Sequence, residues 1–431
     1  MARKSVFLSF LFLTPADFRL IIKFRVYFLI QLQEKTMKTT LENKKLTIYL
    51  EGRIDTTNAP TVEEEIFAAL EKSQGADIVL DAAALAYISS AGLRVLMKLK
   101  KRIDTTLPVV NVSPEVYDIF ETTGFTTLLD VQKKLREISV EGCEVVGEGA
   151  NGKVYRLDEE TIIKVFAPGV PLQTVQEERN IAQAAFVAGV PTAISYDVAK
   201  VGESYGAVYE MLHAKTLSAF IVEHPQQAEE MGRRMGALLK ELHHTPASTG
   251  KLPNMLSVYK ERAQKMEKYL TKEELKKLML AYDQLEERST MLHGDYHPKN
   301  IMYMDGELLF IDMGDVGYGH PLLDLGGSYV AMEHIGKVNP AMTQKYIGID
   351  FETLTRVWKS LLGEYFGEAH AEEGRKLAEI YGEAKYALTP FIYTKMTEDM
   401  ANDLVARTRK TGFNNPDFDI GPALHRSISF D

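Results

Sequence analysis

The sequence predicts a short N-terminal tail, then an α/β domain, then a larger α+β domain. Three observations lead to this fold class. The chain has 431 residues, which is too long for one ordinary domain. Strand-like and helical segments alternate between residues 37 and 138, as in a small α/β domain. Strand-like segments then dominate residues 139–212, and helical segments dominate residues 213–431.

Composition limits the classes of function. Apolar residues make up 45% of the chain and charged residues 26%, as is usual for globular proteins in water. The formal net charge is −10, so we expect no nucleic-acid partner, because polyphosphate binding needs a basic surface. The single cysteine, Cys143, can form no disulfide within the chain and has no ligand cluster near it. A lone cysteine favours a reducing compartment, and we expect a cytoplasmic protein.

The first 36 residues (1–36) differ from the rest of the chain. They contain two apolar runs, at 6–13 and 20–30. Neither run reaches the roughly 20 residues that a membrane span needs, and Lys23 and Arg25 interrupt the second. No small-x-small cleavage site follows the first run, as a signal peptide would require. Because Met37 resembles a natural start, we expect the tail to be upstream sequence read in frame, and we expect no membrane partner.

Residues 37–138 carry the patterns of an alternating α/β domain. Polar and apolar side chains alternate at 46–52, and short apolar runs at 77–81 and 107–111 are typical of buried strands. Apolar residues recur at helical spacing after a turn at 55–60 and again over 90–101. Two further helices are expected at 114–122 and 131–138.

This first domain resembles a STAS domain, the fold of bacterial anti-sigma factor antagonists. The resemblance rests on Gly-Arg-Ile-Asp at 52–55, Ile-Ser-Ser-Ala-Gly-Leu-Arg at 88–94 and Glu-Thr-Thr-Gly-Phe at 121–125. It implies a module that docks a protein partner.

The resemblance also implies a phosphorylation site at Ser90, the position of the phosphorylated serine in the antagonists. Ser89 stands where those proteins carry an aspartate, and Ala91 replaces their second hydroxyl residue. A phosphate on Ser90 would meet the positive end of the helix that begins there. The alternative is that Ser89 and Ser90 only cap that helix, and the loss of the aspartate favours this alternative.

A glycine-rich pattern, Gly-x-Gly-x-x-Gly, falls on Gly147, Gly149 and Gly152. Glycines let a backbone approach phosphate groups closely. A dinucleotide-binding turn should open a helix, but a β-branched and aromatic run follows here. Lys164 lies within the apolar strand-like run 161–166. Because a lysine is costly to bury unless it is paired, nucleotide phosphates and a helix carboxylate are its natural partners.

The most informative stretch is 293–300, His-Gly-Asp-Tyr-His-Pro-Lys-Asn, followed by an apolar run that leads to Asp312. At this spacing Asp295, Asn300 and Asp312 can converge on one place. One of them can hold a hydroxyl group, and two can hold Mg²⁺, which prefers oxygen ligands shared with phosphate. The two histidines of this stretch are interpreted as loop scaffolding, because no further ligands for zinc occur at fitting spacing.

This stretch resembles the catalytic loop of the aminoglycoside phosphotransferase and choline kinase superfamily, which reads His-Gly-Asp-x-(three more)-Asn and then Ile-Asp. Gly294 stands where protein kinases carry an arginine, which favours the small-molecule branch. The resemblance implies a protein-kinase-like fold, with an N-lobe over 139–212 and a C-lobe with a helical substrate-binding region over 213–431. It also implies ATP and Mg²⁺ as cofactors.

The resemblance assigns roles to individual residues. The three glycines would cover the phosphates. Lys164 would hold the α- and β-phosphates and would be oriented by Glu178, with Glu177 as the second choice. The backbone around Glu210 and Leu212 would meet the adenine. Asn300 and Asp312 would hold Mg²⁺, Asp295 would accept the proton of the acceptor hydroxyl, and Asp324 would brace the loop.

Three functions are consistent with these residues. The first is an ATP-dependent small-molecule kinase fused to a regulatory or docking module. The second is a kinase that acts on a protein serine or threonine, such as Ser90 of its own first domain. The third is a non-catalytic, nucleotide-sensing scaffold in anti-sigma-type signalling. A competent residue fills every catalytic position, which argues against the third. The acceptor itself is not encoded in any motif.

Overall fold

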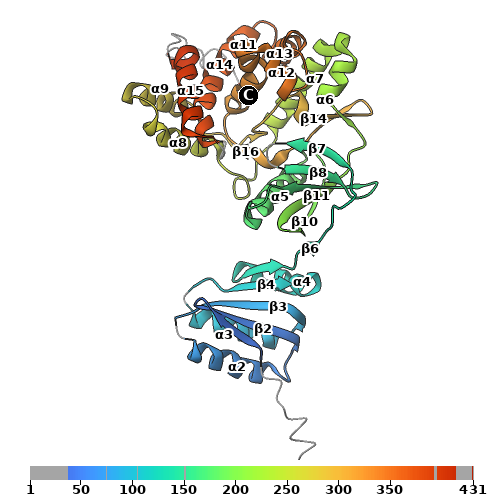
Figure 1. The fold of residues 1–431 in the computed structure, drawn as a ribbon, viewed down its shortest axis with the longest axis vertical. Helices are drawn as coiled ribbons and strands as arrows, with labels where there is room; N and C mark the ends of the chain where they lie inside the picture. The colour runs from blue at the N-terminus through green and yellow to red at the C-terminus, as the bar shows by residue number, and fades with distance from the viewer. Residues whose placement is uncertain are drawn as a thin grey trace, which may run out of the picture. The chain divides into compact units, whose positions relative to one another are not determined.

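A computed structural model describes residues 37–73, 75–103, 105–149, 152–392, 396–413 and 430 (Figure 1). The interpretation of residues 1–36 therefore falls outside the described residues. The chain forms two compact units, which divide between Leu135 and Arg136. The first unit is an α/β STAS-like domain, and the second is an α+β kinase-like domain, as the sequence predicts.

The first unit is built on a five-stranded sheet in the order β1-β2-β3-β4-β5. The first two strands are antiparallel, and the remaining pairs are parallel, as expected when helices connect successive strands. Apolar side chains of the strands and of helices α2, α3 and α4 form one buried core. The elements are β1 (Thr39–Glu42), β2 (Lys45–Ile54), α2 (Ala59–Lys72), β3 (Asp77–Ile88), α3 (Ser90–Arg102), β4 (Pro108–Val112), α4 (Pro114–Thr122) and β5 (Asp130–Lys133).

The helix predicted at 131–138 is wrong. The segment instead contributes two short strands, β5 and β6 (Arg136–Glu137). β5 pairs in parallel with β4, and β6 pairs in parallel with β10 in the second unit. Each strand completes the edge of a sheet, so backbone pairing across the sheet outweighs the local helical pattern.

The second unit begins with a six-stranded sheet in the order β6-β10-β11-β9-β8-β7. Every pair except β6–β10 is antiparallel. One helix, α5, packs against β10 and β11. The elements of this lobe are β6, β7 (Val145–Gly149), β8 (Gly152–Arg156), β9 (Thr161–Phe166), α5 (Leu172–Val187), β10 (Ser195–Val201) and β11 (Ser204–Glu210).

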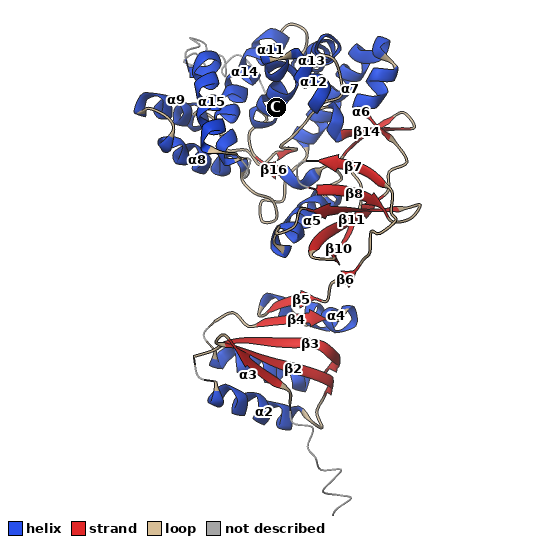
Figure 2. Ribbon diagram, viewed as in Figure 1, coloured by secondary structure: helices blue, strands red, loops and turns tan. Residues whose placement is uncertain are grey.

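The remainder of the second unit is mainly helical around one large apolar core, and Figure 2 shows this change from strands to helices. Its helices are α6 (Leu217–Glu223), α7 (Ala228–His244), α8 (Met255–Lys265), α9 (Lys272–Asp283), α10 (Leu322–Tyr329), α11 (Ile335–Val338), α12 (Pro340–Tyr346), α13 (Phe351–Phe366), α14 (Ala371–Ala387) and α15 (Glu398–Thr408). Its short strands are β12 (Lys215–Thr216), β13 (Met291–Leu292), β14 (Ile301–Met304), β15 (Glu307–Phe310) and β16 (Gly317–Tyr318).

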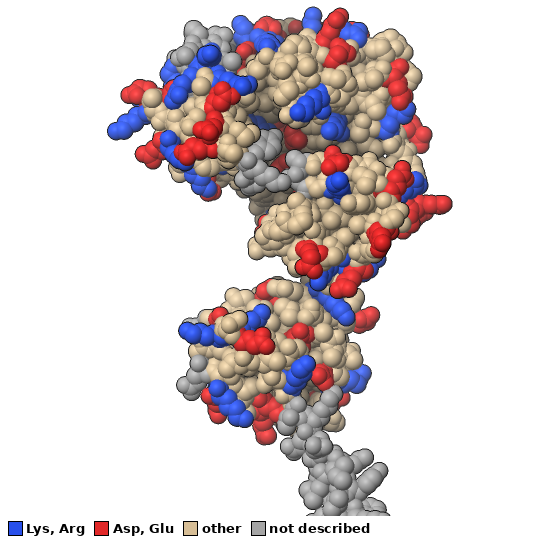
Figure 3. Space-filling model, in the orientation of Figure 1, with Lys and Arg blue, Asp and Glu red and all other residues tan. Residues whose placement is uncertain are grey.

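Two further features of the described residues concern membrane-spanning helices and surface charge. Within the described residues, no helix has the length and apolar character that crossing a membrane requires. On the face drawn in Figure 3, acidic and basic side chains of the described residues are interspersed.

Candidate functional site

The β14–β15 hairpin brings Asn300 and Asp312 together. Ile301 at the start of β14 is paired with Phe310 at the end of β15. Just beyond this pair, the Ile311 N–H donates to the Asn300 carbonyl at 3.0 Å. Asn300 and Asp312 therefore flank the open end of one hairpin, although eleven residues separate them in the sequence.

Asp295 lies directly against Asn300. The Asn300 Nδ2 donates to the Asp295 carbonyl at 2.9 Å and to Asp295 Oδ2 at 3.1 Å. His297 Nε2 lies 3.4 Å from the same carboxylate oxygen, and the Asp295 side chain is half-exposed. Burial opposes ionisation of Asp295, but His297, Lys385 and His293 outweigh it and hold its pKa well below the usual range. The carboxylate is thus ionised, fixed and open to a ligand.

Asp312 belongs to an ion-pair network that reaches the N-lobe. Lys164 Nζ on β9 lies 2.7 Å from Asp312 Oδ1 and 2.7 Å from Glu178 Oε1 on α5. Glu177, the second choice for this partner, is exposed and accepts from Gln173 instead. Asp312 has a left-handed backbone with φ +58°, a conformation that aspartate tolerates better than most residues.

The charges in this network stabilise one another. Burial opposes the charge on Lys164, but Asp312 and Glu178 overcome it and raise the lysine pKa above its ordinary value. Burial also raises the pKa of Glu178, while Lys164 pulls it down. Lys164 therefore stays protonated between two carboxylates, as a group that binds phosphate oxygens must.

The residues present fit a magnesium ion. Because the Asn300 amide nitrogen donates to Asp295, its amide oxygen is the atom that can bind a cation. The Asp312 carboxylate, which follows the paired strand of the same hairpin, is about half-exposed. Among the described residues, no three His, Cys, Asp or Glu side chains cluster as a metal site. Mg²⁺ does not need such a cluster, because it binds through one or two protein oxygens together with substrate phosphates.

Asp324 braces the loop, as the sequence predicts. Its two carboxylate oxygens accept from the backbone N–H groups of His293 and Gly294, both at 2.6 Å. His243 Nε2 lies 3.2 Å away, and the Asp324 side chain is almost fully buried. Burial opposes ionisation, but His243, His293 and these hydrogen bonds hold the pKa of Asp324 below its ordinary value. The loop backbone is therefore fixed by a buried charge.

Gly294 is required by backbone geometry. Its φ is +88°, and a Cβ at this position would overlap the carbonyl oxygen of Asp315. The glycine therefore reflects close packing of the loop on the residues after β15. Because packing alone explains Gly294, this glycine is weaker evidence for a small-molecule acceptor than the sequence suggested.

A substitution tests this reading of Gly294. We expect Gly294→Ala to destabilise the second unit by about 1–3 kcal/mol, because it adds both φ strain and a clash with Asp315. The measurement is a urea midpoint. Gly306→Ala is the matched control, since its φ is also positive (+91°) but a Cβ there meets nothing within 4 Å. Equal losses in the two variants would show that the contact with Asp315 is unimportant.

The glycine-rich hairpin forms one edge of the six-stranded sheet, and its strand β8 is paired with β9. β7 and β8 are paired, with Gly149 opposite Gly152. A Cβ on Gly152 would overlap the carbonyl oxygen of Val165, next to Lys164 in sequence, so this position needs a glycine. A Cβ on Gly147 would make only ordinary contact with Val154, and one on Gly149 would meet nothing. Packing thus explains Gly152, whereas Gly147 and Gly149 leave space beside the backbone.

Glu210 and Leu212 lie at the junction after β11. The Glu210 N–H donates to Ile194 O at 2.9 Å, and its carboxylate accepts from Ile194 N at 3.1 Å. The Met211 N–H donates to Glu160 O at 2.7 Å. Leu212 is buried, and its carbonyl accepts from the Ala214 N–H. The Glu210 side chain thus holds the junction together.

Ser90 lies in the first unit and is the first residue of α3, where the sequence places it. Ser89, rather than Ser90, is the helix cap, and its side chain accepts from the Ala91 N–H at 3.2 Å. Ser90 itself is exposed.

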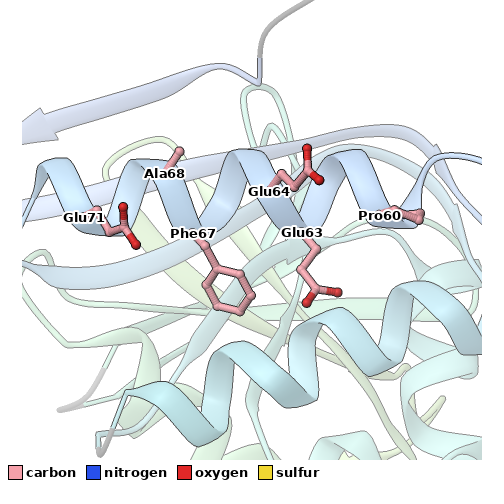
Figure 4. Close-up of a pocket in the computed structure, with 6 residues that line it drawn as sticks. All are labelled: Pro60, Glu63, Glu64, Phe67, Ala68 and Glu71. Atoms are coloured by element: carbon pink, nitrogen blue, oxygen red, sulfur yellow. The ribbon is translucent and has the colours of Figure 1, made fainter.

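The same unit has a shallow surface hollow on α2 (Figure 4), in which Glu63 and Phe67 project from the same side of the helix. Its lining residues are Pro60, Glu63, Glu64, Phe67, Ala68 and Glu71. Lys98 pairs with Glu63 and Arg102 with Glu71, both across to α3. The acidic groups that face α3 are therefore neutralised, and nothing in this hollow resembles a catalytic site.

Two residues near Asp295 were given no role from the sequence: Lys385 was not singled out, and the role of Asp315 was left undecided. Lys385 on α14 donates from Nζ to the Gly294 carbonyl at 2.6 Å. Asp315 follows Asp312 closely, and burial together with the Asp295 and Asp312 charges raises its pKa. A lysine in an amphipathic helix carries no signal of such a contact, because lysines usually lie on solvated faces.

Two family models match the chain. The model of the phosphotransferase enzyme family matches residues 142–355, and the STAS domain model matches residues 35–138. A protein of Bordetella bronchiseptica described as an anti-sigma factor antagonist is 34% identical over 100 residues. That match covers 22% of this chain and 85% of the other protein.

The solved structures that match the chain include a kinase family protein and a kinase. A choline/ethanolamine kinase family protein from Mesorhizobium loti is 18% identical, with a TM-score of 0.45, and the match covers 66% of this chain and 92% of that one. An amicoumacin kinase in complex with AMP-PNP and Ca²⁺ is 16% identical, with a TM-score of 0.42, over 77% of this chain and 99% of that one.

Proposed function

We propose that this chain, which belongs to the phosphotransferase enzyme family over residues 142–355 and carries a STAS domain over residues 35–138, transfers the γ-phosphate of ATP to a hydroxyl group of a small molecule. The observation that carries the proposal is the set of contacts around the catalytic loop. Asp295 contacts Asn300, and the adjoining hairpin strand leads to Asp312, which is paired with Lys164. Lys164 is also paired with Glu178.

Each group has a chemical task in this reaction. Asp295 accepts a hydrogen bond from the acceptor hydroxyl, orients its oxygen towards the γ-phosphate and takes the proton late. Lys164, held by Glu178, binds the α- and β-phosphates, and the hairpin with Gly147, Gly149 and Gly152 covers them. Positioning and charge neutralisation account for most of the catalysis in phosphoryl transfer.

Asn300 and Asp312 would hold Mg²⁺, which neutralises phosphate charge when bound. The adenine would meet the junction after β11. The Glu210 and Met211 N–H groups are already bonded inside the protein, so we assign the adenine contact to the backbone near Leu212. The need for ATP also favours a cytoplasmic location.

The test of this function is ADP formation by the full chain with Mg·ATP, with and without pools of amino sugars, amino alcohols and sugars. Stimulation by one pool would support a small-molecule acceptor. Bound ATP without stimulation by any pool would argue against it.

The proposed contact of Lys164 with the ATP phosphates can be tested by substitution. Lys164→Met should raise KM for ATP and lower kcat, with a combined loss in kcat/KM of roughly 10²-fold or more, because a charge-assisted phosphate contact disappears. Steady-state kinetics at varied ATP provide the measurement. Lys200→Met, an exposed position on β10, is the control. Similar kinetics in the two variants would remove Lys164 from the ATP site.

A second candidate acceptor is a protein hydroxyl. Ser90 is exposed at the start of the 13-residue helix α3, where a phosphate would face free N–H groups. The STAS domain would then serve as both docking module and substrate. In either case we propose that it binds a protein partner.

A further inference from the structure

Lys385 joins the catalytic loop from a distant part of the chain. It lies on α14, beyond the residues that the phosphotransferase family model matches. Its Nζ donates to the Gly294 carbonyl at 2.6 Å. The same peptide unit carries the N–H of Asp295, so this hydrogen bond holds the residue that we propose to accept the proton.

Close helix packing delivers Lys385 to the loop. Helices α10 and α14 approach each other through glycines, since a Cβ on Gly326 would clash with the Tyr381 backbone and one on Gly382 with the Tyr329 ring. A Cβ on Gly327 would lie 2.6 Å from Lys385 Nζ. Small residues at this crossing therefore leave the space that the ammonium group occupies.

The surroundings of Lys385 are mainly acidic. The charged and titratable groups near it are Asp295 on the loop, Asp315 after β15, Asp324 on α10 and Tyr259 on α8. Burial opposes the charge on Lys385, but these groups outweigh it and raise the lysine pKa above its ordinary value. In return, Lys385 lowers the pKa of both Asp295 and Asp315. His293 and His297 are the other titratable groups that act on Asp295.

We infer that Lys385 is a positioning residue for phosphoryl transfer: its ammonium group anchors the Gly294–Asp295 peptide and thereby holds Asp295 in place. The inference rests on the proposed function of Asp295. It adds a role for α14, a helix outside the matched family region, in setting the reactivity of the catalytic loop.

Two substitutions test the anchor that Lys385 provides. Lys385→Gln keeps a hydrogen-bond donor, whereas Lys385→Met removes it. We expect Lys385→Met to lower kcat by about 10- to 100-fold with little change in KM for ATP, because a shifted loop misplaces Asp295. Lys385→Gln should recover most of this loss.

Hydrogen exchange followed by mass spectrometry measures the anchoring without any turnover. Amide exchange across residues 291–300 should accelerate in Lys385→Met and remain close to wild type in Lys385→Gln. Lys376→Met on the same helix is the matched control. If Lys385→Met fails to fold, Gly327→Ala serves instead, because its methyl group displaces the ammonium group and should produce the same acceleration of exchange.

Each outcome is decisive. In Lys385→Met, a lower kcat with little change in KM for ATP and faster loop exchange would support the inference. Wild-type turnover and wild-type exchange in Lys385→Met would overturn it. A wild-type chain that transfers no phosphate would overturn the proposed function, and the exchange comparison would still decide whether Lys385 anchors the loop.

Discussion

Replacing Asp295 with asparagine is expected to lower kcat for acceptor phosphorylation by roughly 10²- to 10⁴-fold, the usual contribution of a positioned proton acceptor. Asparagine preserves the size of the side chain but can neither take a proton nor provide a negative charge. The Asp295 carboxylate is half-exposed and its pKa is lowered, so it is an ionised acceptor in the wild-type protein. ATP affinity should stay near the wild-type value, because the proposed mechanism assigns Asp295 to the acceptor and not to the nucleotide.

The measurement is steady-state kinetics with the stimulating acceptor, together with calorimetric titration of ATP. Asp305→Asn is a suitable control because Asp305 is exposed, lies at the far turn of the β14–β15 hairpin and has a positive φ (+50°) that asparagine also adopts. Retention of wild-type kcat in Asp295→Asn would assign the proton to another group. Loss of ATP binding would instead indicate a nucleotide role for Asp295.

The largest expected effect on stability comes from Asp324→Asn. Asparagine offers one acceptor where the wild-type protein has two, and its NH₂ group would face a backbone N–H donor. Two buried N–H groups and His243 depend on this carboxylate. We expect a loss of about 3–5 kcal/mol in the free energy of unfolding of the second unit, as for other broken buried charge pairs.

The same group predicts a pH dependence. The folded-state pKa of Asp324 is lowered from 3.8, so its stabilising contribution is fully present above the unfolded-state pKa. That contribution is lost as pH falls through the lower, folded-state value. The wild-type protein should therefore lose stability on acidification more steeply than Asp324→Asn, which has no carboxylate to protonate.

Urea midpoints at neutral and acid pH test both statements. The two units unfold separately in principle, so the midpoint is read from the tryptophan signal, since the single Trp358 lies in the second unit. Asp283→Asn, which affects an exposed ion pair with Lys260, is the control. If the midpoints of the Asp324 and Asp283 variants were equal, Asp324 would not brace the loop.

The sequence alone predicted those contacts that depend on short segments of the chain. The spacing of Asn300 and Asp312 predicted their proximity, because one hairpin joins them. Lys164 within an apolar strand predicted a carboxylate partner, since a buried lysine needs one, and Glu178 is such a partner. The roles of these residues in binding ATP and Mg²⁺ remain predictions.

Other features depend on contacts between distant segments. The helix predicted at 131–138 became β5 and β6 because two sheet edges offered backbone partners that a local pattern does not reveal. Gly294 was interpreted through its family counterpart, whereas the carbonyl of Asp315 explains it directly. Lys385 was missed because its contact spans 91 residues.

The central claim is that the Asp295 site passes phosphate to a small molecule. A single turnover of [γ-³²P]ATP by the full chain, with Mg²⁺ and the stimulating acceptor pool, tests it most directly. We predict that the label appears in the small-molecule fraction and that Asp295→Asn abolishes this transfer. Label on the protein that disappears in Ser90→Ala would contradict the claim in favour of a protein acceptor, and bound ATP with no transfer would contradict catalysis itself.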